Sequence, residues 1–173
     1  MKISHISTSD SLGGSAVSAR RIHENLLKYG FDSNLFFGFK NSDVKKSFYL
    51  TQRPNLRKVD FFFDFISNKL GHQYKFLPSN IFLNKKIIQS SIIQLYNLHG
   101  GYFQISLLEK LEKFGKLVLR LSDYWSFTGH CAYPDSCEKW KSICHSCPDL
   151  KTYPGIGFDR TSSLWNQKKK IFN

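Results

Sequence analysis

Short apolar segments alternate with polar, turn-forming segments along this chain, and the alternation predicts a repeating order of strands and helices. Residues Lys2 to Ser7 alternate between apolar and polar positions, which is typical of a strand. After the loop T-S-D-S-L-G-G-S, Ser15 to Tyr29 places apolar residues at helical spacing, and Gly30 stands where the helix would end. Ser33 to Phe39 predicts a second strand. A strand, a glycine-rich loop, a helix and a strand open a doubly wound parallel sheet.

The rest of the chain continues this pattern after a less regular, basic middle. That middle contains one short strand-like run, Phe48 to Leu50, and a predicted helix, Val59 to Leu70, that ends at Gly71. The later elements are a strand at Ile92 to Leu98, a helix at Ile105 to Phe114, a strand at Lys116 to Leu121, and a helix at Arg160 to Phe172 capped by Thr161 or Ser162. The predicted fold class is α/β, a Rossmann-like parallel sheet flanked by helices.

Three polar segments follow predicted strands directly. They are Asp10 to Gly14, His99-Gly100-Gly101 and Ser122-Asp123. Ligands of parallel sheets bind outside the carboxyl ends of the strands, so these segments are expected to converge on one site.

Each of these groups has a functional and a structural interpretation. The backbone N–H groups at Gly13-Gly14 can approach a phosphate or sugar at a helix N-terminus, but Gly-Gly is also an ordinary tight turn. Neither G-x-G-x-x-G nor G-K-[ST] is present. His99 can bind a substrate hydroxyl or transfer a proton, or it can simply bond a backbone carbonyl. Asp123 can orient a hydroxyl or accept a proton, or it can cap a turn.

All the cysteines of the chain fall in the segment 130–149, which also contains His130, His145 and Trp140. The four are spaced C-x5-C-x6-C-x2-C: Cys131, Cys137, Cys144 and Cys147. Four thiolates suit a tetrahedral zinc site, and C-x2-C is a usual chelating pair, although the C-x5-C arm is unusual for small zinc fingers. His130 or His145 could replace one cysteine. Disulfides, four separate thiols, or a redox or nucleophilic role are the alternatives.

Composition narrows the class of protein. With 173 residues and 41% hydrophobic content the chain is long and apolar enough for one folded domain. It has no apolar run of membrane-spanning length and no signal-peptide pattern, so a cytoplasmic location is expected. The net charge of +12 favours an anionic partner or simply solubility. Phe61-Phe62-Phe63 and Phe65, close to basic residues, could contact a membrane, but the buried face of a helix is the favoured interpretation.

Several motifs together resemble bacterial glycosyltransferases of family 4. They are H-I-S-T-S-D-S-L-G-G-S-A-V-S-A-R-R-I, Y-N-L-H-G-G-Y-F, and S-D-Y-W-S-F-T-G-H-C-A-Y with C-x-x-W-K-x-x-C-H-x-C-P. The resemblance covers essentially the whole chain and points to the group that assembles exopolysaccharide or O-antigen units, including colanic-acid-type enzymes. It implies a GT-B fold and transfer of a sugar from a nucleotide-sugar to an acceptor, with retention of configuration and no catalytic metal or other catalytic cofactor.

The resemblance also assigns residues. Gly13 and Gly14 match the family's glycine loop, and His99 matches the histidine of N-L-H-G-G at the edge of the cleft. Apart from the matched positions, Asp10 and Trp125 are candidates for substrate binding, as is Ser122, whose hydroxyl can donate a hydrogen bond. Ser122 stands where many family members have the histidine of a His-Asp pair, and serine cannot take a proton near neutral pH. The expected catalytic residues are therefore His99 and Asp123.

A complete enzyme of this kind needs a second domain that carries most nucleotide contacts and an E-x7-E-type motif, which this sequence lacks. Residues 1–173 are therefore expected to be the N-terminal, acceptor-side domain, with little activity alone. Its expected partners are a nucleotide-sugar donor, a lipid-linked saccharide acceptor, a complementing C-terminal domain and the inner membrane face. The alternative is a zinc-stabilised basic binding module without catalysis, which would bind nucleic acid or act as a protein scaffold. Nucleic acid is not expected as a partner, because the cysteine segment also holds Asp135, Glu138 and Asp149.

Overall fold

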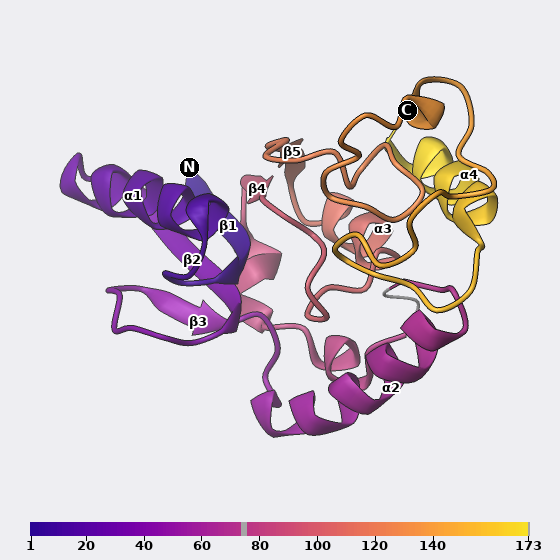
Figure 1. Ribbon diagram of the computed structural model, residues 1–173. Coiled ribbons are helices and arrows are strands. Elements are labelled where there is room, and N and C mark those ends of the chain that lie inside the picture. The colour runs from indigo at the N-terminus through magenta and orange to yellow at the C-terminus, as the bar shows by residue number, and fades with distance from the viewer. Residues whose placement is uncertain (74–75, 173) are drawn as a thin grey trace.

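The computed structural model describes residues 1–73 and 76–172, and its centre is a five-stranded parallel sheet (Figure 1). The strands lie in the order β3-β2-β1-β4-β5, and every neighbouring pair is parallel. Their bounds are Lys2–Ser9 for β1, Asp32–Phe39 for β2, Ser47–Tyr49 for β3, Ile92–Leu95 for β4 and Lys116–Leu119 for β5. From β1 the chain adds strands on one side of the sheet (β2 and β3) and then on the other side (β4 and β5), so the switch point lies between β1 and β4. Ligands of such sheets bind at the switch point. The predicted fold class is confirmed.

Helices flank the sheet in the predicted order. Four α-helices and four short 3-10 helices are present in the described residues: α1 (Gly14–Lys28), α2 (Arg57–Lys69), α3 (Leu107–Glu112), α4 (Thr161–Phe172), η1 (Pro54–Leu56), η2 (Pro78–Phe82), η3 (Lys85–Gln89) and η4 (Lys139–Lys141). The predicted ends were wrong for three later elements, because β4, β5 and α3 are each shorter than the apolar runs that predicted them. The apolar residues beyond β4 are still buried, but they lie in a loop.

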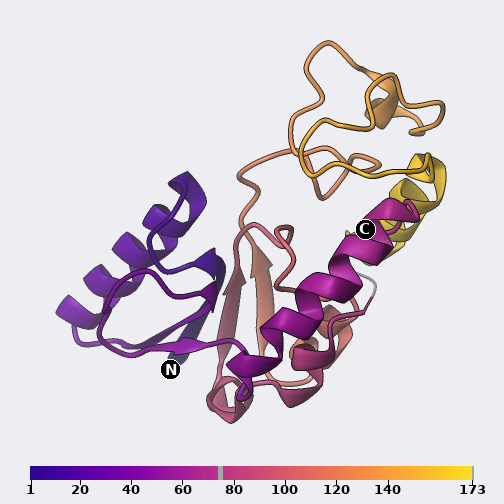
Figure 2. The same cartoon turned by 60° about the horizontal axis from the view of Figure 1, so that its bottom comes forward.

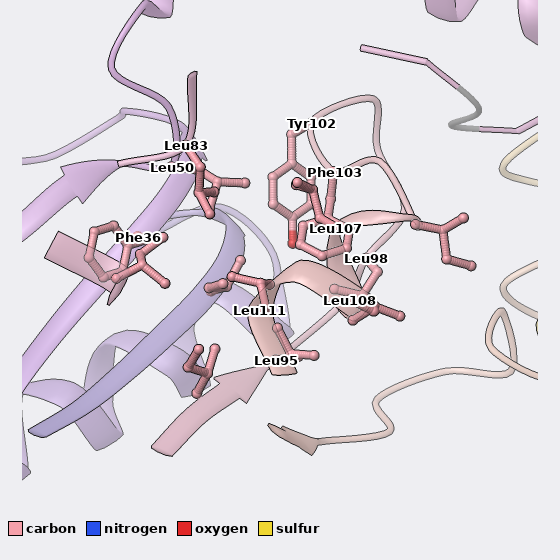
Figure 3. Packing of buried hydrophobic residues seen from close by; sticks show 14 of the residues in the cluster. Phe36, Leu50, Leu83, Leu95, Leu98, Tyr102, Phe103, Leu107, Leu108 and Leu111 are labelled. Carbon is pink, nitrogen blue, oxygen red and sulfur yellow. The ribbon is translucent and has the colours of Figure 1, made fainter. Parts of the chain in front are cut away.

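The sheet buries both of its faces, as its strand sequences require. Leu35 of β2 packs with Ala19 of α1 and with Tyr96 on one face. Its neighbour Phe36 points to the other face and joins a larger cluster with Leu95 of β4 and Leu111 of α3 (Figure 3). Successive side chains of a strand alternate between faces, so two adjacent apolar residues fill two cores.

Helix ends follow local backbone chemistry. Gly30 has φ +81° just after α1, and the N–H groups of Gly30 and Phe31 donate to the carbonyls of Leu27 and Leu26. This is the expected glycine-terminated helix end, in which a left-handed residue satisfies the last carbonyls. The cap predicted for α4 was wrong, because the Asp159 carboxylate accepts from the N–H of Thr161 at 3.0 Å.

The favoured interpretation of the phenylalanines on α2 was also wrong. Phe61, Phe62 and Phe65 are 52%, 61% and 58% exposed, and Asp60 is the buried residue of the helix. Asp60 faces the interior, where it accepts the N–H of Ser79 at 2.9 Å. Consecutive helical residues point about 100° apart, so a row of three phenylalanines cannot lie on one buried face.

A buried polar pair lies between the sheet and α1. His5 of β1 and His23 of α1 have ring centroids 6.0 Å apart, and His5 Nδ1 lies 3.2 Å from the Tyr96 hydroxyl. Burial, followed by the neighbouring His23, lowers the pKa of His5 to about 4. Between pH 6.5 and about 4, His5 is therefore mostly protonated in the unfolded chain but mostly neutral in the folded protein.

We expect His5→Asn to flatten the acid side of the stability profile. Because the folded pKa lies below the unfolded value of 6.5, stability is complete above pH 6.5 and is lost as the pH falls toward 4. The loss attributable to His5 approaches about 3 kcal/mol over that window. Asparagine keeps a polar atom for Tyr96 but does not titrate. Urea unfolding at several pH values measures this, and identical acid slopes for the two proteins would contradict it.

The cysteine segment lies between β5 and α4 and has little regular structure. Between Leu119 and Thr161 the only helix or strand is the short η4. In Figure 2 the strands β4 and β5 point toward this segment, which lies above α4. None of the helices among the described residues is long and apolar enough to cross a membrane.

Candidate active site at the carboxyl ends of the strands

His99 lies at the centre of a small polar cluster just beyond β4. Its Nε2 lies 2.7 Å from Oδ2 of Asp123, and its Nδ1 lies 3.3 Å from the hydroxyl of Tyr153. A carboxylate accepts hydrogen bonds, so Nε2 carries the hydrogen and Nδ1 of the neutral ring accepts the Tyr153 hydroxyl hydrogen. The structure thus joins His99 and Asp123, which are 24 positions apart in the sequence.

Asp123 is held in place by the backbone that follows it. Its second oxygen, Oδ1, accepts the N–H of Trp125 at 2.9 Å. The Asp123 side chain is 20% exposed and that of His99 is 8% exposed, so the pair lies at the edge of the interior with Asp123 toward solvent. The turn-capping role considered for Asp123 is therefore present. The residue also pairs with His99, and its predicted action on a hydroxyl or a proton stays a prediction.

The loop after His99 needs glycine. Gly100 has φ +103°, and a Cβ there would lie 3.1 Å from the Thr8 side chain. The hydroxyl of Thr8 in turn donates to the carbonyls of Asn97 and His99, at 3.2 and 3.4 Å. β1 therefore fixes the loop that carries His99, which explains why H-G-G follows this strand.

The N-terminus of α1 lies next to the same cluster. Ser15 of its first turn and Ser122 have hydroxyls 3.4 Å apart. No side chain caps the helix, its first turn has no acidic residue, and a Cβ at Gly13 or Gly14 would meet nothing within 4 Å. Uncapped backbone N–H groups and open space in front of them suit an anionic group such as a phosphate. The three predicted segments therefore do meet at one edge of the sheet.

Asp10 is turned toward its own chain rather than toward open space. Its carboxylate is fully buried and accepts the N–H groups of Asn41 and Ser42, at 2.8 and 2.9 Å. These bonds anchor the loop after β2 beside the end of β1. The substrate contact predicted for Asp10 stays a prediction, and the structure gives the residue a supporting position.

Trp125 is likewise placed in the interior. It is 2% exposed, and its indole N–H donates to Oε1 of Gln73 at 2.9 Å. The Lys168 ammonium lies 3.9 Å from the centre of the Trp125 ring system. The structure therefore gives Trp125 a packing role, and its predicted contact with substrate stays a prediction.

Sequence reasoning missed three titratable residues near this site. Tyr153 completes the His99 cluster, and burial, with a smaller effect of Asp123, raises its pKa. Burial also raises the pKa of Asp64 to about 6, and its Oδ2 would lie 3.0 Å from a Cβ at Gly101. Lys168 is buried in α4, where burial lowers its pKa to about 7. Each belongs to an undistinguished stretch of sequence, so no motif could have singled it out.

The arrangement can orient and polarise a hydroxyl group. A carboxylate, an imidazole and a phenol form a connected chain of hydrogen bonds that fixes the ring of His99 and one of its tautomers. The nearby helix N-terminus can hold negative charge. A saccharide hydroxyl beside the pair and a phosphate at the helix are the groups that this geometry accommodates.

The cysteines do not take part in this cluster. They are free thiols, and they line a separate small cavity with His130 and His145. Across residues 1–73 and 76–172, no three or more His, Cys, Asp or Glu side chains are already placed to hold a metal ion.

One comparison with known proteins gives a clear similarity. The chain is 25% identical over 179 aligned residues to WcaC of Escherichia coli K12, a protein provisionally described as a colanic acid biosynthesis glycosyl transferase. The alignment covers 92% of this chain and 42% of WcaC, so the chain spans less than half the length of this relative. No protein-family model and no solved structure matches the chain. The similarity supports a relationship to glycosyltransferases.

Proposed function

We propose that this chain forms the acceptor-side part of a glycosyltransferase active site. The reaction would move a sugar from a nucleotide-sugar to a polysaccharide or lipid-linked oligosaccharide acceptor, with retention of configuration, in exopolysaccharide assembly. The chain would be the N-terminal domain of a family 4, GT-B enzyme. The observation that carries this proposal is the His99–Asp123 pair at 2.7 Å, beside an uncapped helix N-terminus, in a chain similar to a glycosyl transferase.

The groups of the site have separate roles in this proposal. Asp123 fixes the tautomer of His99 and stabilises positive charge on the ring. A hydroxyl of the reacting saccharide would take the place of the Tyr153 hydroxyl at Nδ1 of His99. Gly13 and Gly14 let backbone N–H groups approach a donor phosphate, and the dipole of α1 favours its negative charge. Ser122, at the mouth of the site, can donate a hydrogen bond to a sugar hydroxyl.

The proposal predicts saccharide binding at His99. The experiment follows the imidazole ¹⁵N resonances of the purified chain during titration with a short-chain prenyl-diphosphate-linked hexose and, separately, with UDP- and GDP-linked hexoses. His99→Asn assigns the His99 signals. We expect the lipid-linked hexose to shift the His99 resonances, and shifts confined to the other histidines would contradict the proposed site. A binding module without a saccharide site would show no shift of the His99 resonances with any of these ligands.

A second part of the proposal concerns location at an anionic membrane. The exposed phenylalanines of α2 lie beside cations, with Lys69 Nζ 4.8 Å from the Phe65 ring and Lys58 exposed. Exposed aromatic side chains flanked by Lys and Arg are the features of interfacial membrane binding, and the chain carries a net charge of +12. A lipid-linked acceptor would be presented at such a surface.

Replacement of Phe62 and Phe65 by serine is expected to reduce binding to anionic vesicles more than tenfold. Each phenylalanine that enters an apolar phase contributes on the order of 2 kcal/mol. Flotation with vesicles containing phosphatidylglycerol measures this, and Tyr29→Ser is the matched control because Tyr29 is 74% exposed but lies at the far end of α1. Equal flotation of the wild-type chain with neutral and anionic vesicles would refute the membrane proposal.

A further inference from the structure

The four cysteines of the chain face one cavity although no disulfide joins them. Cys131, Cys137, Cys144 and Cys147 all line a cavity of about 20 Å³, together with His130 and Gly129. That volume holds little more than one water-sized sphere, which requires about 10–15 Å³. A Zn²⁺ ion with thiolate ligands has a size that suits this space.

Two groups are already oriented toward these thiols. The Gly129 N–H donates to Sγ of Cys144 at 3.1 Å, and a Cβ at Gly129 would lie 3.0 Å from Cβ of Cys144. His130 is 1% exposed, and its Nδ1 lies 3.1 Å from the carbonyl oxygen of Pro154. A carbonyl can only accept, so Nδ1 carries the hydrogen and the lone pair of Nε2 points to Sγ of Cys147, 3.3 Å away. Metal-binding histidines usually have their other nitrogen held in this way.

We propose that the cysteine cavity binds one structural Zn²⁺ ion, with Cys144 and Cys147 as the chelating pair and with two of the three donors Cys131, Cys137 and His130 completing the four ligands. The segment has almost no secondary structure, and a metal centre stabilises such loops directly. Across the described residues no three of these side chains are already placed to hold a metal ion, so binding would include a rearrangement of the thiol groups that line the cavity.

The position of this site suggests what the metal does for the rest of the protein. The cysteine segment leaves the sheet at Asp123 and returns at Tyr153, the two partners of His99. Backbone bonds join the two arms through Ala132, whose carbonyl accepts from Tyr124 at 2.9 Å and whose N–H donates to Tyr153 at 2.8 Å. Ala132 follows Cys131 directly. The zinc ion would therefore hold both partners of His99 in place.

The test begins with metal analysis of the full chain purified under reducing conditions. We expect one zinc ion per chain by mass spectrometry. After removal of the zinc, Co²⁺ should give the thiolate charge-transfer and strong visible bands of a tetrahedral site. These two readouts do not depend on transferase activity, so they also stand if the proposed function fails. Folded, metal-free protein with four titratable thiols and no Co²⁺ spectrum would overturn the proposal.

Variants locate the site. Cys144→Ser and Cys147→Ser are expected to lose bound zinc, whereas Ser142→Ala, an exposed change in the same loop, should retain it. If the cysteine variants fail to fold, refolding of the wild-type chain with and without Zn²⁺ gives the same information, because only the sample with metal should recover its native circular dichroism. Retention of zinc by Cys144→Ser, or metal-independent refolding, would contradict the assignment.

Discussion

Replacement of Asp123 by asparagine is expected to lower the transfer rate of the assembled enzyme by roughly 100-fold or more while the fold is retained, in the range that general acid–base groups contribute. Asparagine can still accept the Trp125 N–H through its single oxygen, which preserves the turn. Its NH₂ group cannot accept from Nε2 of His99, so the histidine loses the partner that fixes its tautomer.

Initial rates of sugar transfer measure this effect, and circular dichroism reports the fold. Asp135→Asn is the matched control, because it makes the same chemical change at an exposed position of the cysteine segment. Asp135 has φ +49°, which asparagine tolerates. An Asp123→Asn rate within about threefold of wild type, well under the effect expected of an acid–base group, would remove Asp123 from the chemistry. If Asp123→Ala unfolds the protein, turn formation is the main role of this residue.

Trp125→Ala is expected to cause the largest loss of stability, about 3–5 kcal/mol in the free energy of unfolding. The indole is buried in the main hydrophobic cluster, and its removal leaves a cavity, an unpaired Gln73 oxygen and an uncovered Lys168 ammonium. Urea unfolding measures the change. Trp165→Ala, at a half-buried tryptophan of α4, is the control and should cost less.

This prediction also separates two roles for Trp125. A tryptophan that stacks on a sugar could be truncated with little loss of stability but with weaker acceptor binding. A packing residue behaves in the opposite way, and Trp125→Phe should then recover part of the stability. Unchanged stability of Trp125→Ala together with weaker saccharide binding would favour the substrate-binding role.

The parallel sheet was predictable because its signals are local. Apolar strands, the helix between Ser15 and Tyr29, and the glycine that ends it all depend on neighbours in the sequence. The convergence of Gly13, His99 and Ser122-Asp123 was also predictable, because carboxyl ends of parallel strands share one edge. The end of strand β4 at Leu95 could not be predicted from the sequence. The buried apolar residues that follow it continue the apolar pattern of the strand, although they lie outside the sheet.

The remaining errors came from tertiary contacts. The run of phenylalanines on α2 suggested a buried face, but Asp60 faces the interior because Ser79, nineteen positions later, supplies an N–H for it. Tyr153 contacts His99 although the whole cysteine segment lies between them in the sequence, so no local pattern around either residue could predict the contact. Lys168 is one of three consecutive lysines, and only the packing of α4 buries it in preference to its neighbours.

The most direct test of the central claim is transfer of radiolabelled sugar from UDP- and GDP-linked hexoses to prenyl-diphosphate-linked acceptors. The purified chain is assayed alone, together with the product of the adjacent downstream reading frame, and that product is assayed alone. We predict acceptor-dependent transfer that requires this chain and that Asp123→Asn slows by roughly 100-fold or more. Transfer by the downstream product without this chain, or no transfer from any donor in the mixture, would contradict the proposal that this site belongs to a glycosyltransferase.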